Sequence, residues 1–133
     1  MTDRDAGTLR GRSEITHMGS RDIEERTFTF AVRIVKLVNA IPRTTVGAVA
    51  ARQLVRSGTS VGANVEEAQG SHSKRDFAHR MNVARREARE ALYWLRLVAE
   101  SDLLEKERFE DIIGEADELV RILTTIVKRS REG

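Results

Sequence analysis

Glu87 and Glu90 are the carboxylates whose spacing could support chemistry, because they lie three residues apart among large apolar residues. With Glu66 or Glu67 they could form a carboxylate site inside a helical bundle. Di-iron bundles of the ferritin type instead place a histidine three residues after a glutamate, since carboxylate and imidazole share the metal. Glu87 and Glu90 have no histidine at that spacing, and His72 and His79 lie seven residues apart. We therefore expect no metal, no cofactor and no enzyme, and a carboxylate-site enzyme is the weakest alternative.

Other catalytic signatures are also missing. The run from Gly58 to Gly62 falls within a helical pattern, and no lysine followed by serine or threonine comes after it, so it does not predict a phosphate-binding loop. The sequence contains no cysteine, which excludes disulfides and thiolate metal sites within the chain.

A basic stripe at helical spacing is a second feature that could bind a ligand. Its cations would contact phosphates and its tyrosine could stack on a base; the members are Lys74, Arg75, Arg86, Arg89, Tyr93 and Arg96. Such a stripe is at least as often a solvated surface, or one that pairs with acids of a neighbouring subunit. The formal charge is only +2. Nucleic-acid binding would therefore be weak, tolerant of base sequence and steeply dependent on salt.

A polar seam beside an apolar stripe is the third feature. Its members are Ser57, Ser60, Gly62, Asn64, Glu67, Glu87, Glu90 and Trp94. Because buried polar groups need partners, we expect Ser60 and Asn64 to be buried and hydrogen-bonded to Glu87 or Glu90. A glycine inside a helix costs about 1 kcal/mol relative to alanine. Gly58 and Gly62 therefore predict a close approach of another helix.

Four amphipathic segments with short connections would position these residues, since apolar side chains recur in each at the spacing of a helix with one buried face. The predicted helices run from Ser20 or Asp22 to before Pro42, from Thr44 or Thr45 to about Ala68, from Ser73 through Val98, and from about Glu105 to Arg129. The sequence thus predicts an all-α fold, an antiparallel up-down-up-down four-helix bundle of residues 21–130. Residues 1–20 lack periodicity and are predicted to form a mobile tail.

The composition fits one cytoplasmic domain. The chain has 133 residues, of which 40% are hydrophobic and 33% charged. No run approaches the roughly 20 apolar residues of a membrane span, and the N-terminus lacks the apolar centre of a signal peptide. We therefore expect no membrane association.

Three segments resemble a known family: residues 22–31, 51–70 and 87–95, with the pattern Ser-x-x-Ser-Val-Gly-x-Asn-x-x-Glu in the second. They are similar to the four-helix-bundle proteins first met as reading frames in intervening sequences of 23S ribosomal RNA genes. The resemblance implies small bundles that assemble into rings of five. A similar protein accompanies the reverse transcriptase of diversity-generating retroelements and contacts nucleic acid. Most relatives have no established activity.

The leading functional hypothesis is a non-enzymatic homo-oligomeric scaffold or interaction module, with a homopentamer favoured by the resemblance. We expect the subunit contact on small, weakly charged surfaces of the second and third helices, including Arg52, Arg56, Thr59, Ala63 and Glu66. RNA or DNA could be the partner, through the basic stripe. The alternative is a purely protein-binding accessory module.

Overall fold

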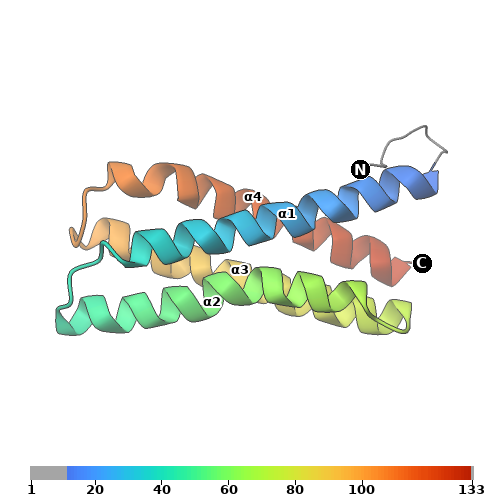
Figure 1. The fold of residues 1–133 in the computed structure, drawn as a ribbon, viewed down its shortest axis with the longest axis horizontal. Helices are drawn as coiled ribbons and strands as arrows, with labels where there is room; N and C mark the ends of the chain where they lie inside the picture. Colours follow the sequence, from blue (N-terminus) through green and yellow to red (C-terminus); the bar gives the residue numbers. More distant parts are fainter. Residues whose placement is uncertain (1–11, 133) are drawn as a thin grey trace.

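Four long helices run antiparallel to their chain neighbours in the computed structural model, which describes residues 12–132 (Figure 1). They are α1 (Arg12–Val38), α2 (Thr45–Gln69), α3 (Lys74–Glu100) and α4 (Glu107–Glu132). Each helix packs on the next along the chain, and α1 and α4 cross with fewer close approaches. The predicted all-α, up-down-up-down bundle is confirmed.

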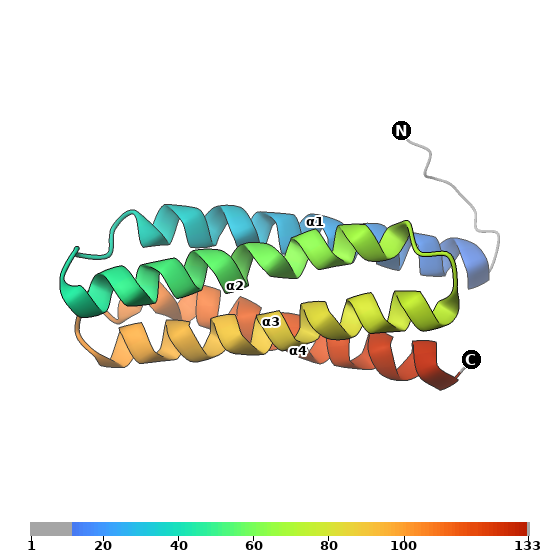
Figure 2. The ribbon, with the colours of Figure 1, turned by 90° about the horizontal axis from the view of Figure 1, so that it is seen from below.

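The two ends of the bundle differ in what they carry. The α1–α2 and α3–α4 connections lie at one end, and the α2–α3 connection and the end of α4 lie at the other (Figures 1 and 2).

No helix among residues 12–132 is long and apolar enough to cross a membrane.

The predicted start of α1 near Ser20 or Asp22 is wrong, because the helix begins at Arg12. Residues 12–20 show no amphipathic stripe, and helix propensity alone is too weak a signal to place a boundary. The part of the predicted mobile tail that precedes Arg12 lies outside the described residues. The other boundaries lie close to their predicted positions.

Capping side chains fix two of these boundaries. The backbone N–H of Gly47 donates to Thr44 Oγ1 at 3.0 Å, and that of Asp76 donates to Ser73 Oγ at 3.0 Å. Each bond satisfies an N–H of the first helical turn that has no partner within the helix. The starts of α2 and α3 therefore follow from local sequence.

The core lies along the bundle axis and is built from one apolar face of each helix. Its large, fully buried side chains include Phe30, Ile34, Leu54, Val61, Met81, Leu95, Phe109, Leu119 and Leu123. Ala84, Ala88 and Ala91 are also fully buried, and such small side chains let neighbouring helices approach α3.

The two glycines of α2 face α1 at close range. A Cβ added at Gly58 would lie 2.8 Å from Ile34 Cγ1, and one added at Gly62 would lie 3.2 Å from the carbonyl oxygen of Thr27. The close approach predicted from these glycines is confirmed, and it brings α2 against α1. On the other side of α1, Arg26 forms ion pairs with Glu115, at 2.8 Å, and with Glu118 of α4.

Candidate functional site

Arg56 of α2 joins the two glutamates of α3. Its Nη1 lies 3.1 Å from Glu87 Oε1, and its Nη2 contacts Glu90 Oε2. The indole Nε1 of Trp94 donates to the same oxygen of Glu90 at 3.1 Å. Gln53 accepts a 3.2 Å hydrogen bond from Arg56 Nε and so helps to orient the guanidinium. Glu87, Glu90 and Trp94 of the predicted polar seam therefore lie together, but Arg56 joins them rather than Ser60 and Asn64. We call these four residues the Arg56 cluster.

The predicted bonds from Ser60 and Asn64 to α3 are wrong. Ser60 Oγ donates to the carbonyl oxygen of Arg56 at 2.6 Å, and Asn64 Nδ2 donates to that of Ser60 at 2.8 Å. Both residues are half-buried rather than buried. Short polar side chains in a helix can bond the carbonyl one turn back, which removes their need for a partner on another helix.

The remaining seam residues have separate roles. Ser57 is buried and donates to the carbonyl oxygen of Gln53 at 2.7 Å, whereas Glu67 is exposed and Gly62 faces α1. Sequence reasoning missed Arg56 as a member of the seam. Arg56 stands four residues before Ser60, so it lies on the same helix face and could have been found from spacing alone.

The ion pair with Arg56 makes Glu90 a poor proton donor. The hydrogen bond from Arg56 lowers the pKa of Glu90; burial opposes this shift, and the bond from Trp94 adds to it. A general acid needs a pKa near the working pH, so a carboxylate held ionised is poorly suited to that role. Glu66 and Glu67 are exposed on α2. Among residues 22–132 no three His, Asp or Glu side chains gather as metal ligands.

Glu90→Gln is expected to weaken the dependence of stability on acid. Because the pKa of Glu90 is lowered in the folded protein from 4.5, its ionised form contributes stability fully above that value. That contribution is lost as the pH falls through the lowered pKa. The difference between the urea midpoints at about pH 7 and about pH 3 should therefore be smaller in the variant. An unchanged difference would show that the Arg56 cluster is not coupled to folding.

The basic stripe of α3 is solvent-facing. Lys74, Arg75, Arg86, Arg89, Tyr93 and Arg96 are all exposed. Within residues 22–132 its cations form no ion pair. Tyr93 is 57% exposed and its ring packs edge-on against Trp94, with the centroids 5.4 Å apart. The stripe is therefore accessible from solvent.

A second accessible surface, the α1–α2 face, is apolar. We define it by the exposed side chains Phe28, Val32, Val35 and Val55, with Thr59 and Ala63 beside them. Phe28 is 62% exposed. A cleft of about 500 Å³ runs between all of these residues except Val55, and it is also lined by Gly62, Lys36 and Glu66. Sequence reasoning missed Phe28 and Val32, although Phe28, Val32 and Val35 recur at helical spacing as a second stripe on α1.

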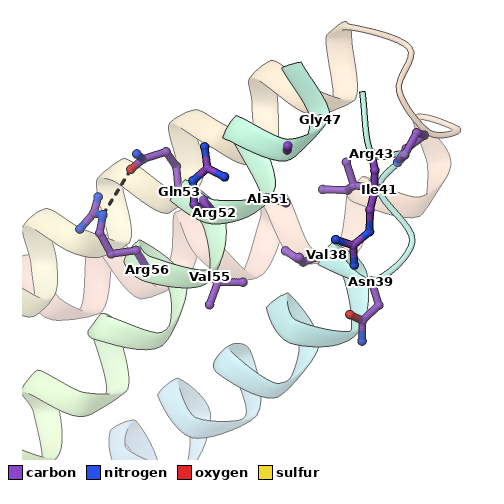
Figure 3. Close-up of a pocket in the computed structure, with 12 residues that line it drawn as sticks. Val38, Asn39, Ile41, Arg43, Gly47, Ala51, Arg52, Gln53, Val55 and Arg56 are labelled. Carbon is purple, nitrogen blue, oxygen red and sulfur yellow. Dashed lines mark hydrogen bonds between the residues drawn. The ribbon is translucent and has the colours of Figure 1, made fainter. Parts of the chain in front are cut away.

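A neighbouring cleft continues the α1–α2 face toward the loop between these helices. It measures about 560 Å³, and Figure 3 shows Val38 and Ile41 on one side of it and Ala51 and Val55 on the other. Arg43, Arg52 and Arg56 stand around this cleft. The two clefts together leave an apolar groove along most of the α1–α2 contact.

The fold and these surfaces define a small antiparallel four-helix bundle with one apolar and one basic side. The chain belongs to the 23S rRNA-intervening sequence protein family, whose model matches residues 20–125. It is similar to the crystal structure of a protein of unknown function from the S23 ribosomal protein family of Bacteroides thetaiotaomicron, with 35% sequence identity and a TM-score of 0.76. That similarity covers 82% of this chain and 97% of the other. No curated protein matches the chain. The expected family is confirmed.

Proposed function

We propose that the protein is a non-enzymatic scaffold that assembles with copies of itself through the α1–α2 face. The exposure of Phe28 beside Val32, Val35 and Val55 carries this proposal. Contiguous apolar surface on an otherwise charged protein marks an interaction site, and burying a side chain such as phenylalanine contributes roughly 1.5–3 kcal/mol when complete. Several such side chains at one contact can offset the loss of rigid-body freedom on association.

The charges around the α1–α2 cleft favour a second copy as its occupant. Lys36 on α1 and Glu66 on α2 are the charged residues lining it, one of each sign. The Lys36 side of the face in one copy can contact the Glu66 side in the next copy, so the two sides are complementary surfaces. Contacts between two different surfaces of identical subunits form a closed ring when the rotation closes. The family resemblance favours five subunits.

The proposed contact differs from the one expected from sequence. We expected the second and third helices, which also carry exposed apolar side chains at Val46, Val49 and Leu97. The proposal uses α1 and α2 because Phe28, the most exposed large apolar side chain among the described residues, lies there. The expected contact and the proposed contact share three residues of α2: Thr59, Ala63 and Glu66. The outer side of α3 carries the basic stripe instead.

Sedimentation equilibrium at micromolar concentration tests the assembly. We expect a mass that is a multiple of the 15.0 kDa subunit, with the fivefold value favoured. A single 15.0 kDa species would contradict self-assembly. In that case the α1–α2 face would instead fit a different protein, as in the alternative of a purely protein-binding accessory module.

Nucleic-acid binding is a second candidate function, favoured by the exposed cations of the basic stripe. Because α1 packs beside α2 and α4, and α3 packs beside the same two helices, the outer side of α3 lies away from the α1–α2 face. Assembly through that face would therefore leave the stripe accessible and repeat it in every subunit. Repetition raises the avidity of sites that are individually weak.

Salt dependence tests this second function. We expect a labelled oligonucleotide to bind the wild-type protein at about 50 mM salt and to lose affinity steeply by about 200 mM, because neutralised phosphates release counterions. Fluorescence anisotropy across a salt series measures the slope. Absence of binding at the lowest salt would contradict the function.

A further inference from the structure

The start of α3 and the end of α4 lie at the same end of the bundle (Figures 1 and 2). Side chains of both helices line a groove there. It consists of two adjoining clefts of about 530 Å³ and about 360 Å³. Arg131 lines both clefts, so they form one continuous surface. We call it the basic groove and define it by its five cations: Lys74, Arg75, Arg85, Lys128 and Arg131.

The charges of the basic groove are only partly explained by helix stability. Lys128 and Arg131 lie near the end of α4, where the helix dipole favours cations. Lys74 and Arg75 open α3, where the dipole favours acids and each cation costs a few tenths of a kcal/mol. The fold thus brings two cations that oppose their own helix dipole beside two from another helix.

Repulsion within the basic groove is not relieved by the carboxylates around it. Glu132 is the one acid among the residues lining the two clefts. Within residues 22–132 none of the five cations forms an ion pair. A bound anion would relieve this repulsion and would also meet the N-terminal end of α3.

Arg85 is oriented before any ligand arrives. Its Nε donates to Asn82 Oδ1 at 2.8 Å, and the residue is half-buried between α3 and α4. This bond uses one of the five guanidinium N–H donors. The two terminal nitrogens remain available for a planar, bidentate contact with a phosphate group. Less side-chain freedom is then lost when a phosphate binds.

The length and lining of the basic groove indicate the class of ligand. Lys74 and Arg85 lie eleven residues apart on α3, which corresponds to about 16 Å along the helix axis. That span exceeds a single phosphate group and fits several consecutive phosphates. The lining contains no Phe, Tyr or Trp, and its one ring is the imidazole of His79, so stacking on bases contributes little.

We propose that the basic groove binds the sugar–phosphate backbone of a nucleic-acid strand, irrespective of its bases. The inference rests on the nucleic-acid binding proposed above, and it moves the principal contacts from the middle of α3 to the α3–α4 groove. The groove lies on the side of the bundle away from the α1–α2 face, so self-assembly leaves it open.

Two double variants of the full-length protein distinguish the groove from the stripe. R85A/R131A removes two cations of the basic groove, whereas R89A/R96A removes two cations of the stripe that do not line it. Both change the net charge equally. With a labelled strand of about 20 nucleotides, we expect the groove variant to bind about tenfold or more weakly than wild type. The slope of the logarithm of the binding constant against the logarithm of the salt concentration should become less steep by about 2. The stripe variant should change much less.

Further measurements separate the outcomes. Circular dichroism and sedimentation check that each variant is folded and assembled. If R85A/R131A is not, K128Q/R131Q replaces it, since both positions are exposed, line the groove and lie outside the stripe. Binding by wild type that is lost only in the stripe variant would overturn the groove and leave nucleic-acid binding standing. No binding by wild type would overturn both. Competition by ATP or inorganic phosphate at micromolar concentration would overturn the strand as ligand in favour of a single phosphate group.

Discussion

Phe28→Asp is expected to convert the proposed assembly into folded monomers of 15.0 kDa. Phe28 is 62% exposed in the single subunit, so the fold of the bundle depends little on its ring. Each subunit contact through the α1–α2 face would bury this side chain. A carboxylate in its place would lose its hydration without gaining a cation or hydrogen-bond donor as a partner. That cost is several kcal/mol at every contact of the ring.

Thr29→Asp provides the matched control for this experiment. Thr29 is the next residue on α1, is also exposed, and does not line the α1–α2 clefts. It adds the same charge to the same helix turn, so we expect its sedimentation to match that of wild type. Circular dichroism on both variants checks that they are helical. If Phe28→Asp retains the wild-type mass, the assembly does not use this face.

The fold was predictable from sequence because its determinants are local. Apolar spacing gives four helices, and the capping residues Thr44 and Ser73 mark where two of them begin. The glycines Gly58 and Gly62 predicted a close helix contact, which the structure places against α1. The start of α1 was missed because residues 12–20 carry no comparable pattern.

The surfaces were less predictable because they depend on how helices pair. Apolar spacing on α1 gives one stripe with Phe30, which predicts that this ring is buried, and a second with Phe28, which the bundle leaves exposed. Arg56 crosses to α3 because its long side chain can reach two carboxylates there. The shorter Asn64 bonds its own helix instead.

The basic groove was also not predictable from sequence, because it depends on how two helices pair. Arg85 and Arg131 are far apart in the sequence, and their meeting depends on the antiparallel register of α3 and α4. Placing α1 and α2 on one side of the bundle and α3 and α4 on the other separates an apolar surface from a basic one. A scaffold needs such a separation, because self-assembly would otherwise bury the surface that meets the partner.

Gly58→Leu is expected to lower the free energy of unfolding by roughly 1–3 kcal/mol. Even a Cβ at this position would lie 2.8 Å from Cγ1 and 2.9 Å from Cγ2 of Ile34, which is fully buried. Isoleucine in a helix is held to essentially one χ1 rotamer, so Ile34 cannot turn aside. The leucine must push α1 away from α2. Overpacking of this kind costs roughly 1–3 kcal/mol or more, and here it exceeds the gain of under 1 kcal/mol in helix propensity.

Gly114→Leu separates the overpacking from the propensity gain. Gly114 lies within α4, and a Cβ there would meet no atom within 4 Å. The same substitution should therefore stabilise the protein by up to about 1 kcal/mol, because only helix propensity changes. Urea unfolding of both variants at one protein concentration measures the difference, since any self-assembly makes stability depend on concentration. A Gly58→Leu protein as stable as the Gly114→Leu protein would show that α1 and α2 are not locked together at Ile34.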